Sequence, residues 1–172
     1  MKHYNEIAAV YDDQYAEEQK RKYEIVLHNI HILNGDCILD LGSGTGLFEA
    51  IGLECCVVGV DISTSMLMKA TQRHCGHKIS FLQADTSNLP FAEGVFDKIF
   101  SFTVLQNVPD VEKTMVEMRY VARKGSKVVL SVLKKGFARA SFLGVLKRSG
   151  LSLVEFIDEE ILKDYIVVCE VL

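Results

Sequence analysis

Short apolar runs alternate along the chain with longer segments in which apolar residues recur every three or four positions. The short runs have the length and composition of buried parallel strands, and the longer segments follow the helical period. This alternation predicts an α/β fold with a mostly parallel sheet. The predicted strands are 38–41, 57–61, 79–84, 96–102, 127–133, 151–158 and 164–171, and the last two are expected to pair as a hairpin.

The expected helices flank these strands. Residues 4–15 and 17–33 form the first two, and Asn34-Gly35 ends the second. A third helix begins at Ser63 or Thr64, a fourth runs from Asp110 to Arg123, and a fifth covers 137–149. The link Leu47–Val58 is short and contains Gly52, so we expect only one or two helical turns there.

In the segment CILDLGSGTG, from Cys37 to Gly46, the first strand leads directly into glycines at 42, 44 and 46. Glycine lets the chain turn sharply while a ligand lies against its backbone. The second strand ends in Asp61, about 20 residues further on, where a carboxylate can accept hydrogen bonds from ribose hydroxyls. This arrangement predicts a nucleotide-binding βαβ unit.

The spacing of the glycines distinguishes between nucleotides. The dinucleotide fingerprint G-x-G-x-x-G requires glycine at position 47, where this chain has leucine. The glycines instead alternate as G-x-G-x-G and follow an acid, Asp40. This motif, together with Asp61 and the segment QADTSNLPF, resembles class I methyltransferases dependent on S-adenosyl-L-methionine. The resemblance covers the whole chain and is nearest to the type 11 and ubiquinone–menaquinone methyltransferase branch.

The resemblance implies a Rossmann-like, doubly wound, seven-stranded sheet of order 3-2-1-4-5-7-6, with the last strand antiparallel and helices on both faces. It implies a single domain over residues 1–172, with residues 1–33 capping the cofactor site. It also assigns the ribose to Asp61, the adenine to Asp85 and Thr86 between Ile62 and Leu89, and the ammonium to Asp40. The implied cofactor-binding residues are Asp40, Gly42, Ser43, Gly44, Asp61, Ile62, Asp85, Thr86 and Phe102.

The acceptor side is less defined. The loop after the fourth strand, 101–107, lacks the [DNS]-P-P-[YF] signature of methyltransferases that modify exocyclic amines, and we identify no catalytic base. Asn107 and Tyr11 are candidate substrate contacts. For Tyr11 and Tyr15, amphipathic packing of the first helix on the sheet is an equal alternative.

Composition limits the other functions. Five cysteines without a C-x-x-C pair fit a reducing cytosol, and we expect a cytoplasmic protein. We see neither a signal peptide nor an apolar run long enough to cross a membrane. His74, Cys75 and His77 are close in sequence but lack a fourth ligand, so we predict no metal site.

Charge is unevenly distributed. Residues 111–150 hold ten Lys/Arg and two acids, whereas the whole chain has a net charge of −4. Lys134, Lys135, Arg139, Lys147 and Arg148 therefore predict either a positive rim for an anionic acceptor or an ordinary solvated surface.

The acceptor remains open between RNA or protein and a small molecule, and a cofactor-binding subunit without activity is a third alternative. The chain has no lid insertion after the fifth strand, which favours a large substrate or a partner that completes the site. Some minimal relatives of this family need a small zinc-binding activator beside the third strand. Here that strand, ISFLQAD, is apolar enough to require such cover.

Overall fold

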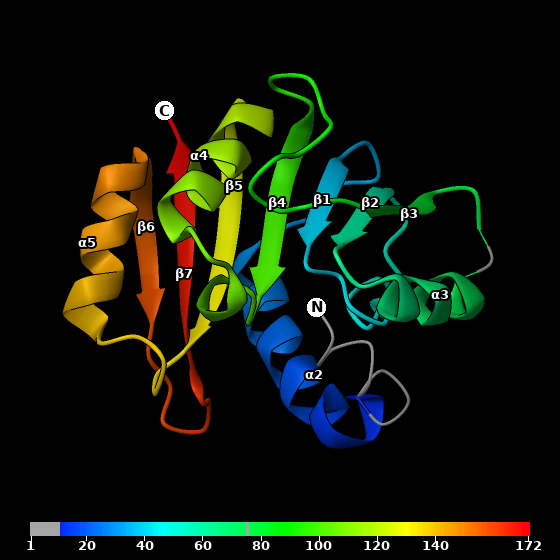
Figure 1. The fold of residues 1–172 in the computed structure, drawn as a ribbon, viewed down its shortest axis with the longest axis horizontal. Coiled ribbons are helices and arrows are strands. Elements are labelled where there is room, and N and C mark those ends of the chain that lie inside the picture. The colour runs from blue at the N-terminus through cyan, green and yellow to red at the C-terminus, as the bar shows by residue number, and fades with distance from the viewer. Residues whose placement is uncertain (1–10, 75) are drawn as a thin grey trace.

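The computed structural model describes residues 11–74 and 76–172, with only the backbone at Tyr11. Its seven-stranded sheet has the order β3-β2-β1-β4-β5-β7-β6, as predicted. The arrowheads of β1 to β5 point to one edge, and β7 runs antiparallel to both of its neighbours (Figure 1). The strands are β1 (Cys37–Leu41), β2 (Cys56–Asp61), β3 (Ile79–Gln83), β4 (Phe96–Phe102), β5 (Ala122–Leu133), β6 (Leu151–Ile157) and β7 (Asp164–Val171).

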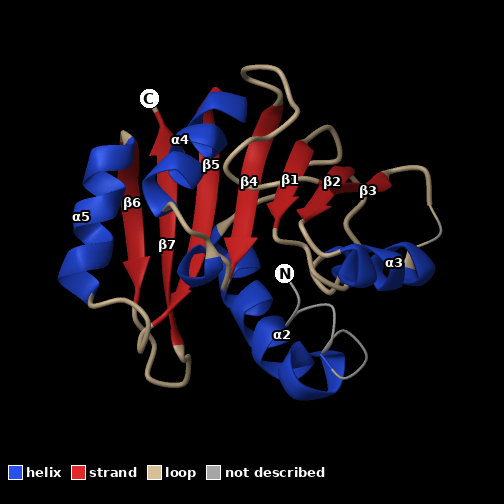
Figure 2. Cartoon of the chain, in the orientation of Figure 1, coloured by secondary structure: helices blue, strands red, loops and turns tan. Residues whose placement is uncertain are grey.

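Helices cover both faces of the sheet, as expected for a doubly wound fold. Helices α4 and α5 lie in front of the sheet, while α2 passes behind the end of β4 (Figure 2). The helices are α2 (Tyr11–Asn29), α3 (Thr64–Arg73), α4 (Val111–Val121) and α5 (Arg139–Ser149), with 3₁₀ turns η1 (Glu49–Ile51) and η2 (Leu105–Asn107).

Two apolar clusters form the core, one on each face of the sheet. On the α2 face, Tyr23 packs edge-on against Phe48 and Phe102, with ring centroids 5.2 and 4.8 Å apart. On the other face, Met115 of α4 and Phe142 of α5 are fully buried in one apolar cluster that includes residues of β4 and β5. The strands between the clusters are buried on both sides, which explains their unbroken apolar runs.

Several predicted boundaries change in the structure. We predicted a break at Ala16, but α2 continues from Tyr11 to Asn29 and ends four residues before Leu33. Strand β5 begins at Ala122 rather than Lys127, because Ala122 already pairs with Phe96 of β4 and the register then shifts before Lys127 pairs with Lys98. The predicted cap at Ser63 is confirmed, since its hydroxyl accepts from the Met66 N–H at 3.3 Å. The link between β1 and β2 holds only the short turn η1, as expected.

Candidate active site

A cavity of about 290 Å³ opens at the carboxyl ends of β1, β2 and β4. Ligands of open α/β sheets bind at this edge, where the strand order reverses. Its wall combines the glycine loop, two carboxylates and an apolar side. The lining residues are Gly42, Gly44, Asp61, Ile62, Met66, Asp85, Thr86, Phe102, Thr103, Val104, Asn107, Val108 and Pro109.

The glycine loop needs its glycines for two different reasons. Gly42 has a φ of 81°, and a Cβ there would lie 2.2 Å from Cγ2 of Val104. At Gly44, with a φ of 56°, a Cβ would meet no atom within 4 Å. Gly42 therefore allows close packing within the protein, whereas Gly44 leaves backbone open to the cavity for a ligand.

Asp61, the last residue of β2, is hydrogen-bonded to this loop. Its carboxylate accepts hydrogen bonds from the backbone N–H groups of Gly44 at 3.0 Å and Ser63 at 2.8 Å. Burial raises the pKa of Asp61, and these N–H bonds offset part of that rise. The carboxylate thus joins the glycine loop to the start of α3 and faces the cavity.

Asp85 lies on the outer side of the same cavity, in the loop after β3. The backbone N–H and the hydroxyl of Ser87 both donate to its Oδ1, at 2.8 and 2.7 Å. These bonds lower the pKa of Asp85. An ionised acceptor is therefore held in a fixed orientation beside Thr86.

Asp40 lies behind the glycine loop and does not line the cavity. It is 3% exposed, and its register partner in β2 is Gly59. Burial raises the pKa of Asp40 well above its usual range, and negative charge on Glu49 and Asp61 adds to the effect. Burial also raises the pKa of Glu49, which is 1% exposed, to about 7. The carboxyl groups of Asp40 and Glu49 form a buried acidic pair behind the glycine loop.

Helix α2 is bonded to the glycine loop at its first turn. The Thr45 hydroxyl donates to Oδ1 of Asp12 at 2.5 Å, and Arg73 of α3 pairs with Oδ2 of the same residue. The helix therefore lies beside the loop that borders the cavity.

The acceptor side of the cavity is the segment 103–109. Thr103 has a φ of 62°, and both Gln106 and Asn107 donate their side-chain amides to its carbonyl oxygen. Val104, Val108 and Pro109 supply apolar surface around this polar centre.

The cavity brings together most of the residues predicted to bind the cofactor. Asp40 and Ser43 do not line it, and Leu89 packs in the core with Phe96 and Met115 instead of facing it. Asn107 lies on the wall, while the side chain of Tyr11 is outside the described part of the structure. Sequence reasoning missed Met66, Thr103 and the polar partners of Thr103, because their proximity depends on long-range contacts.

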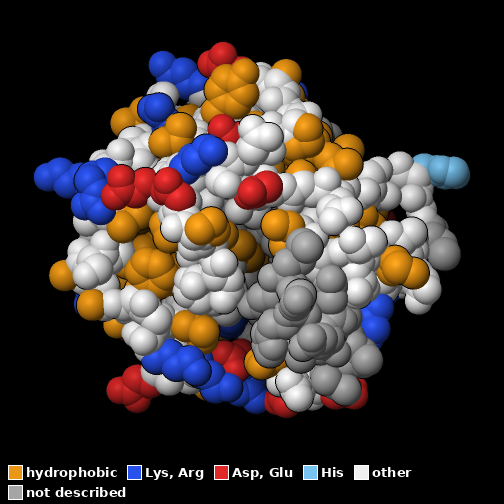
Figure 3. Space-filling model, viewed as in Figure 1, with side chains coloured by type: hydrophobic (Ala, Val, Ile, Leu, Met, Phe, Trp, Pro, Cys, Tyr) orange, Lys and Arg blue, Asp and Glu red, His pale blue; other side chains and the backbone are white. Residues whose placement is uncertain are grey.

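Two of the five residues of the predicted basic rim form ion pairs with acids. Lys134 pairs with Asp158 at 2.7 Å, and Arg148 pairs with Glu112 at 2.7 Å. The guanidinium of Arg139 lies over the Phe156 ring, 4.5 Å from its centroid. In Figure 3, Lys and Arg side chains lie next to Asp and Glu side chains. The ion pairs favour the solvated-surface interpretation for Lys134 and Arg148.

Neither a metal centre nor a membrane span is found in the described ranges. In residues 11–74 and 76–172, no group of three His, Cys, Asp or Glu side chains could hold a metal ion. His74 uses Nε2 to contact the Gly46 carbonyl oxygen at 2.8 Å, and Cys75 lies outside the described residues. No helix in those ranges is long and apolar enough to cross a bilayer.

Comparisons with known proteins agree with this geometry. Residues 39–130 match the family described as a methyltransferase domain. A malonyl-[acyl-carrier protein] O-methyltransferase from Marinomonas is 31% identical over 72% of this chain and 48% of its own length. The ubiquinone/menaquinone C-methyltransferase UbiE of Francisella tularensis subsp. novicida is 33% identical over 64% of this chain and 51% of its own length. The chain thus spans about half the length of these curated relatives.

A solved structure agrees in fold over almost the full chain. It comes from the complex between the Haloferax volcanii Trm112 methyltransferase activator and a protein assigned as a methyltransferase. The TM-score is 0.81 at 17% identity, covering 98% of this chain and 97% of the other. The matched family model covers the glycine loop, Asp61, Asp85 and the acceptor-side segment. The chain belongs to the class I S-adenosylmethionine-dependent methyltransferases.

Proposed function

We propose that this chain binds S-adenosylmethionine in the cavity and transfers its methyl group to an acceptor at the 103–109 segment. The observation that carries the proposal is one cavity lined by Gly44, Asp61 and Asp85 at the carboxyl edge of a parallel sheet. The cofactor offers an ammonium, ribose hydroxyls and an adenine amine, all hydrogen-bond donors, and this wall is rich in acceptors.

The residues fit such a ligand. Asp61 would accept from the ribose hydroxyls, and Asp85 with Thr86 would face the adenine. Open backbone at Gly44 would allow close approach, while Ile62 and Phe102 supply apolar surface. Ser43 would act through the loop backbone, and Asp40 would influence the ammonium from behind the loop. Helix α2, bonded to Thr45 through Asp12, would close one side of the site.

Bound S-adenosylmethionine supplies a sulfonium methyl group for in-line displacement. The protein then has to place the acceptor in line with that methyl group and exclude water. Val104, Val108 and Pro109 would exclude water, and Asn107 would hold a polar group of the acceptor. No base is assigned.

The acceptor that we favour is a small molecule. The ion pairs of Lys134 and Arg148 weaken the argument for RNA, and the curated relatives are named for quinone and malonyl-carrier methylation. The protein, incubated with tritiated S-adenosylmethionine and fractions of a cell extract, should label a component that resists both nuclease and protease. Label lost on protease treatment would indicate a protein acceptor, and cofactor binding without any label would indicate a silent subunit.

Asp61→Ala should weaken cofactor binding by about 2–3 kcal/mol, or about 30- to 150-fold, because the ribose hydroxyls lose their acceptor. The loop N–H groups of Gly44 and Ser63 lose their partner as well. Calorimetry with S-adenosylmethionine measures the loss. Glu93→Ala, which removes an exposed carboxylate outside the cavity, is the control. Wild-type affinity in Asp61→Ala would exclude this cofactor assignment.

The edge strand β3 is a second feature with functional meaning. It pairs with β2 in unbroken register from Ile79 to Gln83, and Leu82 is 38% exposed. The opposite edge strand β6 carries a register shift between Leu153 and Glu155, a device that discourages further pairing. We propose that β3 receives a strand from a small activator protein of the Trm112 kind.

Leu82→Arg should abolish complex formation with such an activator, because the regular edge would then carry a charge. Size-exclusion chromatography of the co-expressed proteins measures the complex. Leu153→Arg, at a similarly exposed position (43%) on β6, should leave it intact. Equal behaviour of the two variants would contradict the assignment of the β3 edge.

A further inference from the structure

Thr103 adopts a backbone conformation that its own side chain disfavours. Its φ of 62° is the only positive φ of a non-glycine residue in the described chain. For a β-branched residue this is a strained conformation, which persists only where the surroundings hold it. Thr103 also lines the cavity, directly after β4.

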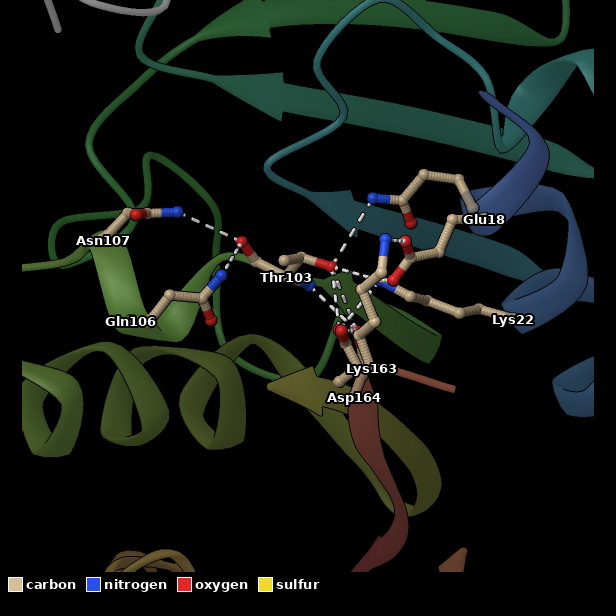
Figure 4. Close-up of polar contacts among 9 residues, drawn as sticks. Glu18, Lys22, Thr103, Gln106, Asn107, Lys163 and Asp164 are labelled. Carbon is tan, nitrogen blue, oxygen red and sulfur yellow. Dashed lines mark hydrogen bonds and ion pairs between the residues drawn. The ribbon is translucent and has the colours of Figure 1, made fainter. Parts of the chain in front are cut away.

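Contacts from three elements hold Thr103 in place (Figure 4). Its backbone N–H donates to the carbonyl oxygen and the hydroxyl of Ser131 in β5, at 3.1 and 2.9 Å. Its hydroxyl accepts from Nζ of Lys22 in α2 at 2.7 Å and donates to Oδ2 of Asp164 in β7 at 2.9 Å. The amide of Gln19 lies 3.5 Å from the same hydroxyl.

Lys22 and Asp164 form an ion pair at 2.8 Å that is almost fully removed from water. Their side chains are 2% and 0% exposed. The Ser131 hydroxyl donates to the same Asp164 oxygen at 2.9 Å, so the charges are both paired and hydrogen-bonded. A buried ion pair contributes little net stability compared with apolar residues, but it can impose one geometry on its surroundings.

The hydrogen bonds of Thr103 extend to the cavity wall. The Thr103 carbonyl oxygen accepts from Nε2 of Gln106 at 2.6 Å and from Nδ2 of Asn107 at 3.1 Å. Asn107 lines the cavity, and its Oδ1 is left to accept a hydrogen bond. One set of contacts therefore leads from helix α2 through Thr103 to the acceptor side.

We propose that the Lys22–Asp164 pair positions the acceptor side of the site by holding Thr103 in its left-handed conformation, from which its carbonyl orients Asn107. Lys22 and Asp164 are positioning residues and do not touch the ligand. The inference rests on the proposed function, because only that function makes the 103–109 segment an acceptor side. The contacts themselves are tested without an acceptor.

The test is heteronuclear NMR of the ¹⁵N-labelled full chain. The side-chain amide signals of Gln106 and Asn107 are assigned by their loss in Gln106→Glu and Asn107→Asp. Lys22→Met should move both signals and increase hydrogen exchange at the Thr103 N–H by about tenfold, since its support is lost. Other Asn and Gln side-chain signals should stay in place, except that of Gln19, whose amide lies beside the Thr103 hydroxyl. Lys20→Met, on the same helix at a 73% exposed position, should change neither signal.

Two further variants keep the test decisive. Lys22→Met/Asp164→Leu removes both charges together and should show the same signal changes if Lys22→Met alone does not fold. Thr103→Gly in the Lys22→Met background should return the Asn107 signal toward its wild-type position, because glycine adopts a positive φ without strain. Unchanged Gln106 and Asn107 signals in both charge variants would overturn the proposal.

Calorimetry with S-adenosylmethionine separates this outcome from failure of the proposed function. Lys22→Met should bind the cofactor within about threefold of wild type, a difference well under 1 kcal/mol, because Lys22 is not part of the cavity wall. A wild-type chain that does not bind the cofactor would refute the proposed function, while the NMR result would still decide the positioning role.

Discussion

Asp164→Ala is expected to lower the free energy of unfolding by about 3–5 kcal/mol, because it leaves the buried Lys22 ammonium with only the more distant carboxylate of Glu18, 4.0 Å away, as a counter-charge. Lys22 is 2% exposed and Asp164 is fully buried, so water cannot replace the lost carboxylate. The Thr103 and Ser131 hydroxyls lose their acceptor at the same time. A loss of this size is a large fraction of the stability of an ordinary domain.

Urea denaturation followed by circular dichroism measures this loss. The matched control is Asp158→Ala, which removes an acid that is 39% exposed and pairs with Lys134 near the surface. That pair should contribute about 1 kcal/mol or less. Lys22→Met/Asp164→Leu should lose less than Asp164→Ala, since no charge remains unpaired. An equal loss of unfolding free energy in Asp164→Ala and Asp158→Ala would show that water or another group stabilises the Lys22 ammonium, and would contradict this prediction.

Glu49→Gln is expected to stabilise the protein by up to about 3 kcal/mol at pH 8, because one pKa unit corresponds to about 1.4 kcal/mol. Burial raises the pKa of Glu49 from 4.5 to about 7. The folded state therefore binds the proton more tightly than the unfolded state does. This contribution favours folding below pH 4.5 and is lost as the pH rises through 7. Glutamine has no proton to lose and removes this dependence.

The unfolding free energies of both proteins should be measured from pH 4.5 to 8. The two curves should meet at the acidic end and separate above neutrality, with the wild type falling more steeply. Glu54→Gln, at an exposed position just after η1, should follow the wild type within about 0.5 kcal/mol. A constant difference between Glu49→Gln and wild type at every pH would mean that packing, and not proton binding, separates them.

The burial of Glu49 next to Asp40 could not be predicted from the sequence. The motif preceding Gly42 indicates an acid near the cofactor, and the structure places Asp40 beneath the loop, against a second acid. Glu49 occupies an unremarkable position in the short link, where nothing in the local pattern marks it as buried. Its burial follows from η1 packing beneath β2, where its Oε1 would lie 2.8 Å from a Cβ at Gly59.

The fold class and the cofactor loop could be predicted from the sequence, because both depend on local signals. Apolar runs with strand length, glycines at 42, 44 and 46, and an acid that ends β2 each act within a few residues. Strand ends needed only small corrections for the same reason. The exception was β5, whose first residue, Ala122, pairs with β4 ahead of a register shift that no periodicity indicates.

The acceptor side was decided by tertiary structure alone. Lys22 and Asp164 are 142 residues apart, and nothing in either segment indicates that they meet at Thr103. Their pairing follows from where α2 crosses the sheet and where β7 inserts beside β5. The pairing of two residues in the predicted basic rim has the same origin, since Asp158 and Glu112 approach Lys134 and Arg148 only after folding. Charge and motif can be counted along the chain, but the partner of a buried or paired charge is set by long-range packing.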